Sequence, residues 1–253
     1  MFDFSTVPET ACATPTPSGG PADQSQQAAV VATAGTGCFN WGYGFNGSGT
    51  GSFNPYIRDA VRGGSGFDTG NALVANQGWI NGQNDDPNAS GTASVGDLMW
   101  AGDVIKASMA GSIRSYSLTT SRDAQLPLKR IDIGGSPLGF VTDPSESVTY
   151  VENHDNQTLS DNNAYKLPLT TTQDDRDRVQ MLGAAVVSFS QGVAYYHAGI
   201  DTLRSKSLDK NTYDSGDWFN RLDWSYADNN FGVRVWGSGL AGGQPPWRLT
   251  NMR

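Results

Sequence analysis

The feature that most constrains the fold of this chain is a strand–helix–strand pattern between residues 147 and 196. Residues 147–151 (S-V-T-Y-V) have the β-branched and aromatic bias of a strand. Residues 173–189 carry apolar side chains at spacings near 3.6, with Val179, Leu182, Val186 and Phe189 on one face, which predicts a helix. Residues 192–196 (G-V-A-Y-Y) then have the pattern of a second strand. This order predicts a βαβ unit and an α/β fold.

Chemistry-bearing side chains follow both predicted strands. Residues 152–156 (E-N-H-D-N) contain no apolar residue, and His197 comes directly after the second strand; His154 and His197 are the only histidines. In α/β barrels and doubly wound sheets, functional groups lie at the C-terminal ends of strands. The helix start is also marked, because Thr172 is placed to cap the backbone amide of Asp175. We therefore expect the functional site at these strand ends.

Four blocks of this sequence resemble one group of enzymes. The block V-E-N-H-D-N-Q-T-L is similar to the last signature of the α-amylase clan, glycoside hydrolase family 13. The other blocks, I-R-D-A-V-R-G-G, L-R-S-K-S and Y-D-S-G-D-W-F-N, resemble pullulanases and limit dextrinases, the debranching enzymes of that family. In chain order they occupy residues 57–64 (followed by Phe67 and Asp68), 151–159, 203–207 and 213–220. The likeness runs from about Gly47 to Val233.

The resemblance implies the C-terminal portion of a (β/α)8 TIM barrel, incomplete in this chain, in an enzyme that hydrolyses α-1,6-glucosidic bonds with retention of configuration. Its partner would be a branched α-glucan such as pullulan, starch or glycogen limit dextrin. Retaining hydrolysis needs a carboxylate nucleophile and an acid/base carboxyl, about 5 Å apart. The family adds a third carboxylate, and Asp155 matches it as the transition-state stabiliser. The implied substrate-binding residues are His154, Asn156, Arg204, Asp217 and Trp218.

The family's nucleophile and acid/base are not recognised in this chain. Their segments resemble G-F-R-F-D and G-E-G-W, and both should precede residue 57. Residues 8–37 are instead rich in Ala, Thr, Pro, Gly, Ser and Gln and have no periodic apolar pattern. Glu152 and Asp201 are carboxylates near the strand ends. Glu152 would alternate in direction with its neighbours and is not assigned to the missing roles.

Length supports an incomplete domain. A complete eight-stranded barrel needs about 250 residues on its own. This chain has 253 residues in total, and they show only one clear βαβ unit. We expect residues 1–46 to be a low-complexity or artefactual segment, residues 47–233 the C-terminal part of the catalytic barrel, and residues 234–253 an unplaced tail. A helix is predicted over 97–110, with Gly111 as its stop. We interpret the chain as a partial or frame-disrupted copy of a longer gene, inactive by itself.

Composition excludes several partners. The net charge of −8 and the pI near 4.6 leave no basic stripe for a nucleic acid, and we interpret Arg204 and Lys206 as a solvated loop. No apolar run approaches the roughly 20 residues of a membrane span. No signal-peptide pattern is visible, and the compartment stays open. Cys12 and Cys38 indicate neither a redox compartment nor a metal motif.

Other interpretations stay open beside the leading one. The chain is alternatively a catalytically silent carbohydrate-binding remnant of the same fold, or a metal-dependent hydrolase built on His154 and Asp155, although such sites need more ligands than the sequence offers. No cofactor is expected. Asp85 and Asp86 lack the spacing of a calcium loop and favour a polar turn. Phe219 is expected to pack inside, whereas Trp218 is a candidate for stacking under a glucose ring.

Overall fold

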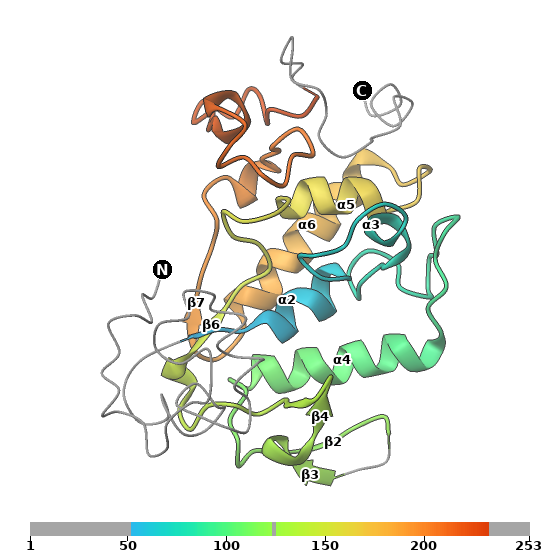
Figure 1. Ribbon diagram of the computed structural model, residues 1–253, viewed down its shortest axis with the longest axis vertical. Helices are drawn as coiled ribbons and strands as arrows, with labels where there is room; N and C mark the ends of the chain where they lie inside the picture. Colours follow the sequence, from blue (N-terminus) through green and yellow to red (C-terminus); the bar gives the residue numbers. More distant parts are fainter. Residues whose placement is uncertain (1–51, 123–124, 233–253) are drawn as a thin grey trace. The chain divides into compact units, whose positions relative to one another are not determined.

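The computed structural model describes residues 52–122 and 125–232 (Figure 1). The predicted segments 1–46 and 234–253 therefore lie outside the described residues, as do both cysteines. The described chain divides into two compact units, and each is treated by itself. The first comprises residues 52–58, 99–150 and 186–195, and the second comprises residues 59–98, 151–185 and 196–232.

A three-stranded parallel sheet forms the centre of the first unit. Its strands are β1 (Ser52–Phe53), β6 (Ser147–Thr149) and β7 (Val193–Ala194), in the order β1-β6-β7. Both pairings are parallel, and β6 pairs with β7 through Val148 with Val193 and Thr149 with Ala194. The βαβ unit and the α/β class predicted from the sequence are thus confirmed. β6 is buried along its whole length, whereas both residues of β7 are exposed.

The described residues contain five α-helices. They are α2 (Pro55–Arg62), α3 (Ala72–Ala75), α4 (Val95–Met109), α5 (Leu159–Lys166) and α6 (Gln173–Ser188). Of these, the sequence predicted α4 and α6. α4 ends at Met109, and Gly111 two residues later has a φ of 88°, the left-handed conformation that favours glycine after a helix. Thr172 caps α6 as predicted, because its Oγ1 accepts a hydrogen bond from the Asp175 amide at 3.2 Å.

The apolar face predicted for α6 is buried only in part, because Val186 is 6% exposed and belongs to the core whereas two other members of the face are exposed. Leu182 and Phe189 are 41% and 77% exposed, while Gln180, Gly183 and Val187 are buried. Burial around Gly183 is explained by this residue itself, which has no side chain and so admits neighbouring groups to the helix surface. A Cβ there would lie 2.7 Å from Leu159 Cδ2 and 3.3 Å from Ile80 Cδ1. The apolar period alone does not reveal a contact made over a glycine.

Aromatic rings and one asparagine hold the first unit together around the sheet. The Phe53 ring lies 4.8 Å from the Tyr150 ring and 5.2 Å from the Tyr195 ring, measured between centroids. Asn54 Nδ2 donates to Ser112 Oγ at 3.0 Å. Two hairpins and two 3₁₀ turns complete the unit: β2 (Ser117–Thr119) with β3 (Gln125–Pro127), β4 (Asp132–Ile133) with β5 (Ser136–Pro137), Leu128–Arg130 and Pro144–Glu146.

The interior of the second unit is unusually polar. The Arg62 carbonyl accepts hydrogen bonds from Asn81 Nδ2 at 2.8 Å and from Asn162 Nδ2 at 2.9 Å. Asn81 also donates to Asn163 Oδ1 at 3.1 Å, and the buried Lys166 donates its ammonium proton to the Asn76 carbonyl. Buried polar groups are tolerated when they find such partners. This network ties α5 to the end of α2 and to the turn that follows it.

Candidate functional site

The loop that leaves β6 is pinned from inside and presents its charged side chains outward. Glu152 is 1% exposed, and its carboxylate accepts the backbone amide of Leu159, the first residue of α5. Asn153 Oδ1 accepts the Asp155 amide at 2.9 Å, and Asn156 adopts a φ of 60°. The His154 and Asp155 side chains are 52% and 60% exposed, with 3.4 Å between His154 Nε2 and Asp155 Oδ1. The backbone is therefore fixed while these two side chains face solvent.

The segment after β7 supplies two buried cations beside this loop. Arg204 Nη1 lies 2.9 Å from His197 Nε2, and Arg204 Nη2 donates to the Asn220 carbonyl at 2.8 Å. Lys206 Nζ donates to the His154 carbonyl at 2.8 Å. Arg204 is 7% exposed and Lys206 is 1% exposed. The interpretation of this pair as a solvated loop is therefore wrong, because both cations are enclosed, Arg204 by groups on either side of it in sequence and Lys206 by the distant His154 carbonyl.

Asp161 holds this cationic segment in place. Its Oδ1 accepts the Ser205 hydroxyl proton and its Oδ2 accepts the Lys206 amide at 2.7 Å. Asp161 is completely buried, and burial raises the pKa of its carboxyl. The Arg204 and Lys206 pKa values are lowered for the same reason. One carboxylate therefore anchors the backbone on which both cations are carried.

The 3₁₀ helix Asp217–Asn220 places an aromatic side chain at the surface. Phe219 is 6% exposed, which confirms that it packs inside, whereas Trp218 is 61% exposed and Asp217 is exposed as well. Asn230 Nδ2 donates to the Trp218 carbonyl at 2.9 Å. Because Arg204 donates to the Asn220 carbonyl, the same helix is tied to the segment after β7. The indole is thus an exposed ring on a fixed backbone.

The blocks that resemble the debranching enzymes converge at this point of the second unit. Arg62 Nη1 donates to the Gln157 carbonyl at 3.4 Å. The backbone at Gly66 approaches Asn156 so closely that a Cβ would lie 2.8 Å from Asn156 Nδ2. Phe67 follows and is 77% exposed. Segments separated by about 90 residues in sequence are therefore neighbours around the β6 loop.

Two buried groups in the site have opposite pKa shifts. Burial raises the pKa of Glu152 to about 7, and the Leu159 amide and the Arg62 charge counteract this only in part. Burial lowers the pKa of His197 to about 4, and the charge of Arg204 adds to the effect. At neutral pH His197 is therefore uncharged, so Arg204 donates to Nε2 and the proton resides on Nδ1. That Nδ1 lies 3.7 Å from Glu152 Oε1.

Comparison with known proteins places the chain in a family. No protein-family model matches it. It is 43% identical over 187 residues to a pullulanase of Klebsiella aerogenes, covering 74% of this chain and 17% of that protein. It is 40% identical over 196 residues to the chloroplastic pullulanase 1 of Arabidopsis thaliana, covering 76% of this chain and 20% of that protein. The matched part of this chain belongs to the pullulanase family.

The crystal structure of a maltotriose complex of PulA from Klebsiella pneumoniae supports the same assignment, with a TM-score of 0.72 at 42% identity. That match covers 74% of this chain and 20% of the solved chain. The chain thus spans a fifth or less of the length of these pullulanases. The family resemblance expected from the sequence is confirmed.

The structure brings together most of the residues singled out for this pullulanase-type site. His154, Asp155 and Asn156 share one loop, which Lys206 contacts, while Arg204 contacts His197 and is linked to Trp218 through the short helix of the latter. Asp217 is exposed at the start of that helix. The sequence did not indicate the roles of Asp161 and Lys206, whose partners lie 44 to 52 residues away.

Within the two described ranges, no group of three or more His, Cys, Asp or Glu side chains is arranged to hold a metal ion. Asp86 lies in a turn, where its amide donates to the Gly82 carbonyl at 3.2 Å. No helix in the described part of the chain is long and apolar enough to cross a membrane.

The opposed pKa shifts predict opposite pH responses of stability in two variants. A raised carboxyl pKa stabilises the fold below the ordinary value of 4.5, and this contribution is lost as pH rises through about 7. A lowered histidine pKa stabilises the fold above 6.5, and this contribution is lost as pH falls toward about 4. Between pH 7 and 5 the two effects oppose each other.

When the pH falls from 7 to 5, we expect the free energy of unfolding of Glu152→Gln to decrease relative to that of the parent chain. Over the same pH range, we expect that of His197→Gln to increase relative to the parent chain. Each difference is about 1 to 2 kcal/mol in the free energy of unfolding. Urea unfolding of the three proteins at both pH values measures it, and groups common to all three cancel. Parallel pH dependences in all three proteins would contradict the assignment.

Proposed function

We propose that this chain carries the transition-state and substrate-binding side of a debranching α-1,6-glucosidase site, within the C-terminal portion of an incomplete (β/α)8 barrel. The observation that carries the proposal is the exposed His154–Asp155 pair on a backbone fixed by Glu152 and Lys206. The pullulanase relatives support the family chemistry, and the maltotriose complex of one relative supports an α-glucan as the ligand.

The barrel part of the proposal is supported by the sheet. Its three strands are parallel, and the site follows the C-terminal ends of β6 and β7, as in (β/α)8 enzymes. Val193 of β7 is 46% exposed, which suits a strand whose outer face would be covered in a larger barrel. The whole enzyme would take a branched α-glucan such as pullulan or a starch or glycogen limit dextrin.

In the proposed mechanism, Asp155 stabilises positive charge that develops on the sugar as the bond to the branch breaks. His154 and Asn156 donate hydrogen bonds to sugar hydroxyls, and Trp218 stacks against a glucose ring with Asp217 beside it. Arg204 is enclosed and orients His197 and the Asn220 carbonyl, so we place its contribution to binding in positioning the surface.

We propose that the chain alone binds α-glucan without cleaving it. Retaining hydrolysis needs two further carboxyls. Glu152, a carboxyl on the same loop as the pair, is 1% exposed and engaged with the Leu159 amide, so it is not available to attack a sugar. Binding without cleavage is expected both if the chain is a carbohydrate-binding remnant and if it is a part of a larger enzyme. The two possibilities differ in whether activity returns when the rest of a pullulanase is supplied.

The test is to titrate the purified 253-residue chain with maltotriose by calorimetry and to assay pullulan for released reducing ends. We expect binding without hydrolysis, and Trp218→Ala weakening that binding about five- to tenfold through lost stacking. Trp224→Ala is the matched control, since Trp224 is 67% exposed and lies outside the site. Equal loss in both variants, or turnover of pullulan, would contradict the proposal.

A further inference from the structure

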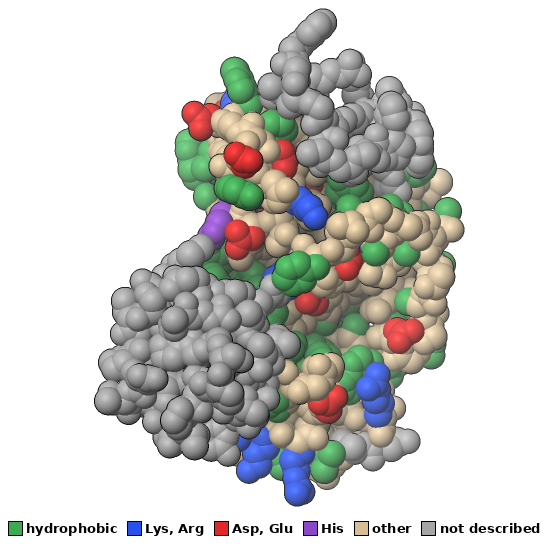
Figure 2. Space-filling model, in the orientation of Figure 1, with side chains coloured by type: hydrophobic (Ala, Val, Ile, Leu, Met, Phe, Trp, Pro, Cys, Tyr) green, Lys and Arg blue, Asp and Glu red, His purple; other side chains and the backbone are tan. Residues whose placement is uncertain are grey.

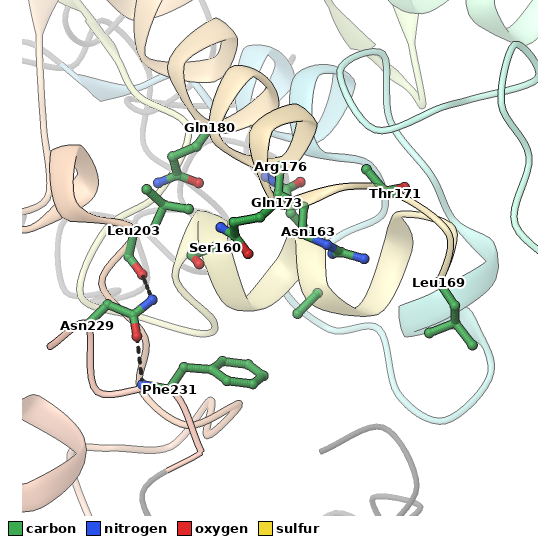
Figure 3. Close-up of a pocket in the computed structure, with 11 residues that line it drawn as sticks. Ser160, Asn163, Leu169, Thr171, Gln173, Arg176, Gln180, Leu203, Asn229 and Phe231 are labelled. Atoms are coloured by element: carbon green, nitrogen blue, oxygen red, sulfur yellow. Dashed lines mark hydrogen bonds between the residues drawn. The ribbon is translucent and has the colours of Figure 1, made fainter. Parts of the chain in front are cut away.

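A second concave site lies in the same unit, on the side of α5 and α6. It is a pocket of about 570 Å³, within the range of small-molecule sites. Figure 3 shows side chains from both helices on one part of its rim and Leu203, Asn229 and Phe231 from later loops on another. No residue assigned to the candidate site above is among those that line it.

Two buried amides in the pocket wall have unused hydrogen-bonding groups. Asn163 is 4% exposed and Gln180 is 1% exposed. Asn163 Oδ1 accepts from Asn81, and Gln180 Nε2 donates to the Ile200 carbonyl at 2.9 Å. The other atom of each amide, Asn163 Nδ2 and Gln180 Oε1, has no hydrogen-bond partner among the described residues. Leaving such a group unpaired costs about 1 to 3 kcal/mol, so the wall offers one donor and one acceptor to a ligand.

The remaining lining indicates an uncharged ligand that both donates and accepts hydrogen bonds. Among the described residues that line the pocket there is no carboxylate and one cation, Arg176, which donates to the Pro168 carbonyl at 3.1 Å. Amides and hydroxyls make up most of the polar wall, while Phe231 and Leu169 add an aromatic and an aliphatic surface. A hydroxyl group can donate a hydrogen bond to an amide oxygen and accept one from an amide nitrogen. The face of a sugar ring packs against apolar and aromatic side chains.

We propose that this pocket is a second α-glucan site, one that takes a short maltooligosaccharide segment away from the His154–Asp155 pair. The choice of glucan rests on the proposed function, whereas the neutral polyhydroxyl class rests on the pocket alone. The two sites are joined by one stretch of backbone. Leu203 lines the pocket, and the next residue, Arg204, contacts His197 in the first site. We therefore propose that one glucan molecule is held at both sites.

The experiment is a maltotriose titration of the full chain and three variants, with a check that each unfolds cooperatively. Leu169→Arg places a long charged side chain at the pocket rim, where Leu169 is 53% exposed and a substitution does not disturb the interior. Leu182→Arg is the matched control, at a 41% exposed leucine of α6 outside the lining. Trp218→Ala removes the stacking ring of the first site. Side-chain amide signals of Asn163 and Gln180 in ¹⁵N spectra report the pocket directly.

We expect two classes of binding in the parent chain. Leu169→Arg should weaken one class at least about tenfold, Trp218→Ala should weaken the other, and Leu182→Arg should leave both within about twofold. Maltotriose should shift the Asn163 and Gln180 amide signals in the parent chain and in Trp218→Ala.

Each alternative outcome decides between the two sites. A single class that is lost in Trp218→Ala and unchanged in Leu169→Arg overturns the pocket and keeps the proposed function. A class lost only in Leu169→Arg, with Trp218→Ala unchanged, supports the pocket and contradicts the proposed role of Trp218. Absence of maltotriose binding to a cooperatively folded parent chain at about 10 mM overturns both.

Discussion

Asp155→Asn is expected to lower the turnover of pullulan about a hundred- to a thousandfold while leaving maltotriose affinity within a few-fold. The reason is that Asp155 is exposed on a fixed loop, where its negative charge favours the charged transition state more than the neutral ground state. Because this chain spans a fifth or less of its relatives, the measurement needs a Klebsiella pullulanase whose matching segment is replaced by residues 52–232.

The matched control for that experiment is Asp201→Asn in the same chimera. Asp201 is also an exposed carboxylate, in the 3₁₀ helix Ile200–Thr202 after β7. We expect its turnover to stay within about twofold of the chimera, since no charge of Asp201 is assigned to the reaction. Near-normal turnover of Asp155→Asn, or an equal loss in Asp201→Asn, removes Asp155 from the mechanism.

Asp161→Asn is expected to destabilise the chain by about 3 to 5 kcal/mol, the usual consequence of removing one partner from a buried charged network. The amide would present a donor to either the Ser205 hydroxyl or the Lys206 backbone amide, both of which now donate to Asp161. It would also remove the carboxylate charge that most counteracts the lowering of the Lys206 pKa by burial. The midpoint of urea unfolding at pH 7 measures the loss.

Asp174→Asn serves as the comparison, because Asp174 is an exposed aspartate in the first turn of α6. Its loss should not exceed about 1 kcal/mol, the scale of a charge at a helix N-terminus. We also expect weaker maltotriose binding in Asp161→Asn, because Lys206 no longer holds the His154 carbonyl firmly. Equal unfolding midpoints for the two variants would show that Asp161 does not anchor the segment.

The local elements of this fold could be predicted from the sequence because their signals are local. β6 follows from a β-branched run, α6 from its period and the Thr172 cap, and the end of α4 from Gly111. Each of these depends on residues within about four positions. The buried face of α6 could not be read in this way, since it depends on Leu159 and Ile80 packing over Gly183.

The residues of the candidate site likewise differ in whether local sequence signals predict them. The side chains that face solvent, His154, Asp155 and Trp218, could be named from motifs. The burial of Glu152, Arg204 and Lys206 could not, because a charged residue is expected outside unless a partner encloses it. The partners of Lys206 lie 45 and 52 residues away, and no pattern in the sequence indicates that the Leu159 amide and His197 enclose Glu152 and Arg204.

The hydrogen bonds that hold the β6 loop join residues at very different separations in sequence. This difference sets the order in which they form during folding. The bond from the Leu159 amide to Glu152 joins residues 7 positions apart, whereas the bond from Lys206 to the His154 carbonyl joins residues 52 positions apart. Short closures cost less chain entropy and form faster. The loop is therefore expected to acquire its shape early, together with the first turn of α5. Its orientation waits until residues 203–207 dock, so hydrogen exchange during refolding should protect the Leu159 amide before the Lys206 amide.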